Sequence, residues 1–511
     1  MSLSRPAARR PLIRTVLRSA WAQSSASKST LRKSVAEYLD WKPEEAAPGI
    51  HVDGYVRSVR AQKKHHFVSL GDGSSIASLQ AVVPAGQAEG LTTGAAVRLH
   101  GSWVPSRGQG QSHELQVQKA DMLGASDAKK KYQTPEYLRS IPHLRPRVPF
   151  NSTLLRFRSE IISSLTRFFE SRQFIQTHTP VLTAADCEGA GEVFSVATID
   201  EKQQPKGETS KAFFRRPVYT TVSAQLHLEA LAQALGNVWT LSPTFRAEQS
   251  DTPRHLSEFY MLEAEMSFTD DMESVMSLVE SMLRHVATEL VDSRTVKELA
   301  VRSAEGASDM APVDRVEQRW QGLMKTDWPR ITYTDAIDIL NASNESFDVK
   351  PVWGQDLRTE HERYLAAHIG DGSTPVFVTN YPRSIKAFYM KTATDDLGKP
   401  VPGETVECFD LLVPDFCEIV GGSMREHRLE NLLDSMSLHG MNPTSEQATS
   451  EDGQQRTAGN NLEWYLDLRR WGCPPHGGFG LGFDRLICYL SGVQTIRDTT
   501  AFPRWYGRCD C

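Results

Sequence analysis

The sequence lacks the features that mark membrane-spanning and disulfide-stabilised proteins. Its 511 residues contain no run of about 18 apolar residues, so we expect no membrane span. Seven cysteines spread over this length provide no disulfide framework. The net charge of -6 excludes a strong overall positive field, so any contact with nucleic acid must come from local basic patches. A chain of this length can form two or more domains with large cores.

Acidic residues are absent from the first 36 positions, which are rich in arginine and serine. Apolar residues such as Leu12, Ile13 and Val16 lie between the arginines. This composition is typical of a mitochondrial transit peptide, so we expect residues 1–36 to direct the chain to the mitochondrial matrix. A basic arm that binds nucleic acid is the alternative.

Residues 48–125 are expected to form a small β-barrel. The candidate strands are 50–59, 66–70, 77–83, 96–103 and 114–121. Turns rich in Gly, Ser and Asp separate them. Five short strands with such turns are typical of an OB-fold.

A basic cluster leads directly into Phe67 near the start of the second of these strands. The cluster consists of Arg57, Arg60, Lys63, Lys64, His65 and His66. Single-stranded nucleic acid needs this combination, because the charges neutralise its backbone and an exposed aromatic ring stacks on a base. Phe67 as an ordinary core residue of the barrel is the alternative.

The segment 126–148 is charged and contains prolines, which indicates a linker. A helix is expected to begin near Asn151 or Ser152, either of which could serve as an N-cap. Its apolar stripe, spaced by three or four residues, consists of Leu155, Ile161, Ile162, Leu165, Phe168 and Phe169. Polar insertions are expected near 201–211 and 442–460, and the segment 296–325 is expected to be irregular.

The stretch 242–266, SPTFRAEQSDTPRHLSEFYMLEAEM, is the most informative one and predicts two strands joined by a polar loop at 249–253. The second strand alternates strictly. One face carries Phe259, Met261, Glu263 and Glu265, and the other carries Tyr260, Leu262, Ala264 and Met266. Phe, Met and two carboxylates make a poor core face, so this face is a candidate floor for a polar, cationic or metal-bearing ligand.

Two arginines stand at the two ends of this hairpin loop. Arg246 and Arg254 could clamp a polyphosphate, because guanidinium groups match the spacing of phosphate oxygens. The alternative is an amphipathic hairpin whose charges are solvated.

Two carboxylates, Asp410 and Glu418, lie near glycine-rich backbone and are suited to holding Mg²⁺ that bridges phosphates. Further along, the glycine-rich string 477–482 is followed by Arg485, which opens an apolar helix. Several glycines in one string indicate a close approach to the backbone.

These strings resemble the motifs of class II aminoacyl-tRNA synthetases, in the subclass that activates Asp, Asn and Lys. FRAE at 245–248 with RHLSEF at 254–259 resembles motif 2. The helix expected from about 151 resembles motif 1, and GLGFDRL at 480–486 resembles motif 3. EGAGE at 188–192 resembles the asparaginyl branch.

The resemblance covers about 48–505 and implies an α+β fold. It implies an OB-fold anticodon-binding domain and a class II catalytic domain over 149–508, an antiparallel sheet flanked by helices. It further implies activation of L-asparagine with ATP and Mg²⁺, transfer to tRNA(Asn), and a homodimer through motif 1. An aspartyl enzyme, possibly accepting both tRNAs, and a catalytically inactive tRNA-binding paralogue are the alternatives.

The resemblance also implies roles for single residues. Catalysis by charge neutralisation falls to Arg246 and Arg485. ATP binding falls to Arg246, Glu248, Arg254, His255, Leu256, Phe259, Glu418, Gly482 and Arg485. Binding of the amino acid falls to Glu188, Gln225, Arg246 and Arg425. Glu418 and Asp410 are the implied ligands of Mg²⁺, although some relatives use a Ser three residues after that Glu, where this chain has Gly421. Phe67 and Gln80 are implied to contact the anticodon. Glu192 and Glu248 are the candidates for distinguishing asparagine from aspartate.

Overall fold

The computed structural model describes residues 32–108, 110–126, 137, 140–185, 192–198, 213–304, 310–394, 404–441 and 462–511. Most of the expected transit peptide, both expected insertions and Glu188 lie outside these residues. The chain divides into two compact units, 1–131 and 132–511. No helix among the described residues is long and apolar enough to cross a membrane.

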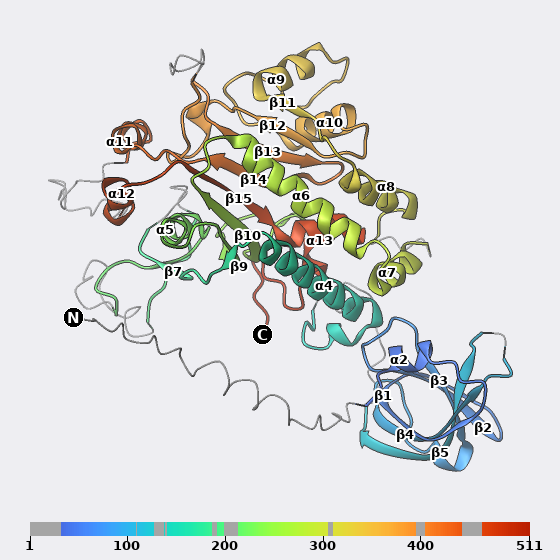
Figure 1. Ribbon diagram of the computed structural model, residues 1–511. Coiled ribbons are helices and arrows are strands. Elements are labelled where there is room, and N and C mark those ends of the chain that lie inside the picture. The colour runs from blue at the N-terminus through green and yellow to red at the C-terminus, as the bar shows by residue number, and fades with distance from the viewer. Residues whose placement is uncertain are drawn as a thin grey trace, which may run out of the picture. The chain divides into compact units, whose positions relative to one another are not determined.

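The first unit is a closed five-stranded barrel with the strand order β1-β2-β3-β5-β4, visible in Figure 1. Its strands are β1 (Ala47–Ala61), β2 (His65–Gly71), β3 (Leu79–Pro84), β4 (Ala96–Pro105) and β5 (His113–Gly124). The expected OB-fold is confirmed, because alternate residues of each strand face a common apolar core. Helix α2 (Val35–Asp40) adds Val35 and Tyr38 to that core, so positions 35 and 36 belong to the folded barrel unit.

The second unit is organised around an eight-stranded sheet with the order β11-β12-β13-β14-β15-β10-β9-β6. Neighbours are antiparallel except for the two outer pairs, β11 with β12 and β6 with β9. Strand bounds are β6 (Ile175–Gln176), β9 (Val238–Phe245), β10 (Glu258–Ser267), β11 (Arg330–Thr332), β12 (Val376–Thr379), β13 (Cys408–Val413), β14 (Cys417–Met424) and β15 (His476–Gly482). Strands β7 (Leu182–Thr183) and β8 (Tyr219–Thr220) form a separate pair.

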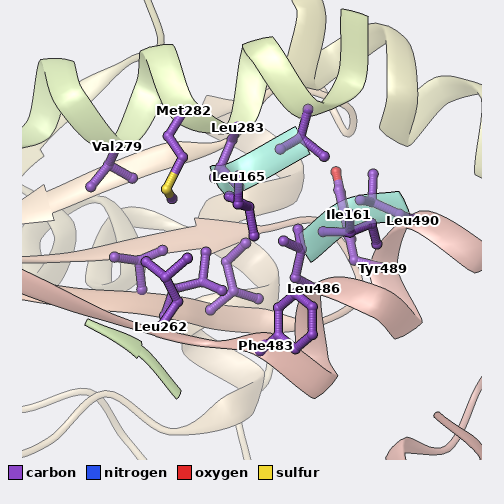
Figure 2. Close-up of a cluster of buried hydrophobic side chains, with 14 of the residues drawn as sticks. Ile161, Leu165, Leu262, Val279, Met282, Leu283, Phe483, Leu486, Tyr489 and Leu490 are labelled. Carbon is purple, nitrogen blue, oxygen red and sulfur yellow. The ribbon is translucent and has the colours of Figure 1, made fainter. Parts of the chain in front are cut away.

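Helices α4 (Pro149–Ser171), α6 (Met272–Leu290) and α13 (Phe483–Ser491) pack on one face of this sheet. Figure 2 shows their buried side chains meeting those of β10. The other helices are α5 (Gln225–Leu235), α7 (Arg294–Ala304), α8 (Val313–Met324), α9 (Tyr333–Ala342), α10 (Thr359–Ile369), α11 (Leu429–Leu438) and α12 (Glu463–Arg470). An OB-fold barrel and an antiparallel sheet with flanking helices confirm the expected α+β fold.

Two local predictions were wrong. The motif 1 helix begins close to the expected position, at Pro149, but its N-cap is Val148 and not Asn151 or Ser152, because proline is favoured in the first turn, where its missing N–H costs no helical hydrogen bond. The segment 296–325 contains parts of α7 and all of α8, although the sequence predicted it to be irregular. In α8 the indole of Trp320 is buried and donates to the carbonyl oxygen of Leu490, so tertiary packing stabilises a helix whose other faces are charged.

The predicted alternation of β10 is confirmed. Leu262 and Ala264 are buried in the core beneath α4 and α6, as Figure 2 shows for Leu262. Glu263 and Glu265 alternate with them and therefore face the opposite side of the sheet. Both are almost fully buried, so their carboxylates must have partners there.

Truncation of Leu486, which is fully buried among these helices, should destabilise the second unit. We expect Leu486→Ala to lower the free energy of unfolding by about 2–5 kcal/mol, because it removes apolar contacts and leaves a cavity. Urea denaturation followed by tryptophan fluorescence measures the loss. Leu438→Ala on α11 is the matched control, since Leu438 is 68% exposed; an equal loss in both variants would contradict the assignment of the core.

Candidate active site

The face of the sheet opposite the packed helices is built from carboxylates and glycines. Residues directly opposite each other in an antiparallel pair share a face. One such row across β13, β14, β15 and β10 consists of Asp410, Gly421, Gly480 and Glu263. The next row includes Ser423, Gly478 and Glu265. In the first row the glycines of β14 and β15 therefore lie between the acid of β13 and the acid of β10.

The glycine at position 478 is required by the side chain opposite it. A Cβ built on Gly478 would lie only 2.0 Å from Oε2 of Glu265 and 2.3 Å from the carbonyl oxygen of Ala264. Any other residue would displace the Glu265 carboxylate or the β10 backbone. The glycine-rich string of the sequence thus makes room for a buried acid.

That acid forms a bidentate ion pair with Arg425, which directly follows β14. Nε and Nη2 of Arg425 lie 3.1 and 3.0 Å from the two oxygens of Glu265, and Nη1 donates to Oγ of Ser423 at 2.5 Å. Burial opposes both charges, yet Glu265 raises the pKa of Arg425. Burial also acts to raise the pKa of Glu265. We take the pair as ionised, because two parallel N–H···O bonds offset the loss of hydration.

Glu263 anchors the start of α5. Its carboxylate accepts hydrogen bonds from Oγ of Ser223 at 2.5 Å and from the backbone N–H of Ala224 at 2.9 Å. A carboxylate at a helix N-terminus is favoured by the helix dipole. The first residue of this helix is Gln225, so Glu263 fixes where the Gln225 side chain begins.

A third buried acid, Glu229, lies on α5 one turn after Gln225. It accepts hydrogen bonds from Nε2 of Gln225 at 3.1 Å, from Nη2 of Arg469 at 2.7 Å and from the hydroxyl of Tyr465 at 2.7 Å. His476 on β15 lies 3.1 Å from the same carboxylate.

The charge states in this cluster follow from its contacts. Burial acts to raise the pKa of Glu229, but Arg469 and His476 outweigh it and hold that pKa well below its ordinary value. Burial acts to lower the pKa of His476, but hydrogen bonds to Cys473 and Glu229 outweigh it and raise the pKa to about 10. Glu229 is therefore anionic and His476 cationic at neutral pH.

The two predicted magnesium ligands converge over one glycine. A Cβ built on Gly421 would lie 3.2 Å from Oε1 of Glu418 and 3.5 Å from Oδ1 of Asp410. Lys386 donates to Asp410 at 2.7 Å, and Nη1 of Arg485 donates to the backbone carbonyl of Glu418 at 2.9 Å. Burial and the neighbouring Asp410 raise the pKa of Glu418, so these carboxylates are poised to gain from a nearby cation.

A third acid beside this pair was missed by the sequence analysis. Burial and the carboxylates of Glu418 and Asp410 raise the pKa of Glu362, on α10, to about 8. Among the described residues, no three His, Cys, Asp or Glu side chains form a ready-made metal group. Two carboxylates without a complete protein cage fit Mg²⁺, which is usually held by one or two carboxylates together with substrate phosphates.

The loop between β9 and β10 carries the predicted ATP residues. The guanidinium carbon of Arg246 lies 5.7 Å from the ring centre of Phe259, and Glu248 lies 3.3 Å from Nε2 of His255. Arg254 donates to the carbonyl oxygen of Asp415, between β13 and β14, at 2.9 Å. Gly482 ends β15, and a Cβ built on it would lie 3.5 Å from Cδ of Arg485. By contrast, the side chain of Leu256 is buried in the core, which leaves only its backbone for a ligand.

In the barrel, the two predicted anticodon residues share one outer face. Gln80 lies opposite Ser69, and Phe67 lies opposite Val82, so Phe67 and Gln80 are diagonal neighbours on adjacent strands. Phe67 is half-buried, whereas its neighbours Val68 and Leu70 form the barrel core. Arg60 adds a guanidinium 4.9 Å from the centre of the Phe67 ring.

The structure thus brings Gln225 and Arg425 together with Glu263 and Glu265, which the sequence placed on a candidate binding face, and with one acid that it did not single out. Glu229 and His476 were missed, although Glu229 stands four residues after Gln225 on the same helical face. Glu192, a predicted discriminating acid, is exposed. The acids buried beside Arg425 and α5 are Glu229, Glu263 and Glu265.

Comparisons with known proteins agree with this geometry. A family model described as tRNA synthetases class II (D, K and N) matches residues 135–506, and one described as OB-fold nucleic acid binding domain matches residues 50–123. The chain is 39% identical over 491 residues to the asparagine–tRNA ligase of Nostoc sp., covering 93% of this chain and 98% of that protein. It is 39% identical over 480 residues to a Saccharomyces cerevisiae protein named asparagine–tRNA ligase, mitochondrial, covering 89% and 92%.

A solved structure shows the same architecture. The crystal structure of asparaginyl-tRNA synthetase from Pyrococcus horikoshii complexed with asparaginyl-adenylate matches with a TM-score of 0.75 and 28% identity, over 93% of this chain and 99% of that one. The motifs, the fold and these matches lead to one conclusion: the chain belongs to the class II tRNA synthetases of the D, K and N group.

Proposed function

We propose that this protein is an asparagine–tRNA ligase, which activates L-asparagine with ATP to asparaginyl-adenylate and transfers the asparaginyl group to tRNA(Asn). The observation that carries the proposal is the arrangement on one sheet face. Arg425 and Gln225 lie at one part of it, and Arg246, Arg485 and the carboxylates of Asp410 and Glu418 lie at another. The names of the similar proteins support asparagine as the amino acid.

The chemistry follows from positioning and charge. The carboxylate of asparagine attacks the α-phosphorus of ATP and pyrophosphate leaves, so no enzyme nucleophile is needed. Arg246 and Arg485 neutralise the charge that develops on the phosphoryl oxygens. Asp410 and Glu418 would hold Mg²⁺, which supplies further positive charge to the phosphates when it is bound.

The choice between asparagine and aspartate rests on one polar group. Arg425 can donate to a side-chain oxygen of either amino acid, so it contributes binding but little selectivity. Glu229, Glu263 and Glu265 provide hydrogen-bond acceptors in this region, and Arg425, Arg469 and His476 balance the charge of two of them. The amide nitrogen of asparagine can donate a hydrogen bond to such an acceptor, whereas the second carboxylate oxygen of aspartate cannot donate and would face the acceptor unpaired. Such polar mismatches are rejected by about 10⁴-fold without editing.

An exchange assay tests the proposal. We expect ATP–pyrophosphate exchange to depend on asparagine and Mg²⁺, and aspartate to support it poorly. Arg246→Ala should lose exchange by a factor of about 10² or more while keeping its fold, because it removes a charge-assisted contact to the reacting phosphate. Comparable exchange with aspartate would establish the aspartyl alternative, and no exchange with either amino acid would favour the inactive paralogue.

The outer face of the barrel supports a separate role in tRNA binding. We expect Phe67→Ala to weaken aminoacylation by about 5–150-fold, because stacking contributes about 1–3 kcal/mol per base, and to spare exchange without tRNA. Initial rates of both reactions are measured with the same enzyme preparation. Phe67 would instead be structural if both rates fell equally.

We place the enzyme in the mitochondrial matrix. The basic, acid-free segment 1–36 and the mitochondrial relative of yeast support this location. A fusion of residues 1–40 to a fluorescent protein should be imported into mitochondria, because positive charge and amphipathicity are what import requires. A fusion that stays in the cytosol would contradict the proposal, and replacement of Arg5, Arg9 and Arg14 by Gln is the control that should abolish import.

A homodimer is also part of the proposal. Strand β6 lies at one edge of the described sheet, and Ile175 in it is 44% exposed. This edge follows the motif 1 helix α4, and an exposed apolar side chain beside that helix supports a partner chain that binds through motif 1. Sedimentation equilibrium distinguishes the dimer from a monomer of 57.1 kDa.

A further inference from the structure

Helix α12 contributes two buried side chains to the cluster around Glu229. Tyr465 and Arg469 lie one turn apart and are at most 6% exposed. The hydroxyl of Tyr465 and Nη2 of Arg469 each donate to Oε2 of Glu229 at 2.7 Å. The hydroxyl also accepts from the same Nη2 at 2.8 Å, so the three groups form a closed triangle of hydrogen bonds.

Glu229 in turn sets the orientation of Gln225. Nε2 of Gln225 donates to Oε1 of Glu229 at 3.1 Å. An ionised carboxylate can only accept hydrogen bonds, so it selects the nitrogen end of the amide and turns the carbonyl oxygen of Gln225 to the other side. A carbonyl oxygen is the end of an amide that can accept from an ammonium group, such as the α-ammonium of an amino acid.

The guanidinium of Arg469 also contacts the segment that carries Arg425. Nε of Arg469 donates to the backbone carbonyl of Glu426 at 3.0 Å. Glu426 directly follows Arg425, so Arg469 connects the backbone that carries Arg425 with the carboxylate that orients Gln225. Arg469 therefore fixes the separation between Gln225 on α5 and Arg425 at the end of β14, the two residues predicted to contact the amino acid.

We propose that Tyr465 and Arg469 are positioning residues for the amino acid: they hold Glu229, and Glu229 holds the Gln225 amide with its oxygen available to the substrate. The inference rests on the proposed function as an asparagine–tRNA ligase. Within the described residues, the hydrogen bonds of these two side chains join them to Glu229, to the backbone of Glu426 and to each other, so we expect their effect to fall on the amino acid and not on ATP. Stability alone would not require a buried tyrosine hydroxyl and a buried ion pair here. Well-packed apolar residues of similar volume often stabilise a fold as well as a buried ion pair does.

The test is a kinetic comparison of Tyr465→Phe with the wild type in ATP–pyrophosphate exchange. The variant keeps the ring and removes one donor to Glu229. We expect the KM for asparagine to rise about tenfold, which is the size of effect that loss of one hydrogen bond to a charged group produces. The KM for ATP and kcat should stay within about twofold, and circular dichroism should show an unchanged fold.

Tyr489→Phe is the matched control. Tyr489 on α13 is also fully buried, but within the described residues its hydroxyl makes no hydrogen bond. Its replacement should leave both KM values unchanged.

A second pair of variants, Arg469→Lys and Arg469→Met, separates the effect of charge from the effect of volume. Lysine keeps a cation beside Glu229 and should restore part of the asparagine affinity that methionine loses.

The outcomes distinguish this inference from the proposed function. If the wild type exchanges with asparagine but Tyr465→Phe leaves the KM for asparagine unchanged, the positioning role is wrong and the enzyme assignment stands. Equal rises in the KM for asparagine and for ATP would show a general structural role and also overturn the inference. If the wild type gives no asparagine-dependent exchange, the proposed function itself fails.

Discussion

The active face depends on the register in which β10, β15 and β14 pair. In this register Gly478 lies opposite Glu265 and Gly480 lies opposite Glu263, so two acids of one strand meet positions without side chains on the next. On the other face the same pairing places Leu262 opposite Leu481, inside the core. A shift by one residue would bury both carboxylates under the helices and expose the leucines, and each unpaired buried charge would cost several kcal/mol. Apolar packing on one face therefore fixes the chemistry on the other.

Much of this could be predicted because the responsible patterns are local. Strict alternation in β10 was visible in eight consecutive residues, 259–266, and the five barrel strands were separated by clear turn residues. The resemblance linked Phe67 with Gln80 but the sequence left open whether Phe67 lies in the barrel core, and only the pairing of β2 with β3 shows that the two are diagonal neighbours on one face. The convergence of Asp410 and Glu418 also follows from adjacent strands, but it required knowledge that the pairing of β13 with β14 shifts its register between Leu411 and Leu412.

The rest could not be predicted because it depends on contacts between distant parts of the chain. Tyr465 and Glu229 are 236 positions apart, and nothing in the sequence around either residue indicates the other. In the sequence, Glu362 cannot be distinguished from an acidic residue on an exposed helix. Only the packing of α10 places it beside Glu418. The helices α7 and α8 were missed for the same reason, since Glu298 of α7 accepts from Arg156, 142 positions away, and Trp320 of α8 donates to a carbonyl group 170 positions away. Long-range partners, and not local propensity, decide the state of these residues.

The strand order has a consequence for synthesis of the chain. β15 is the last of the eight strands to be translated, yet it lies in the middle of the sheet between β14 and β10. Until residues 476–482 leave the ribosome, β9 and β10 on one side and β11 to β14 on the other have no strand to join them. Domains generally fold as units during synthesis, with the N-terminal one first. The barrel can therefore form before the catalytic sheet, whereas that sheet, and any affinity for its substrates, can arise only after β15 has been translated.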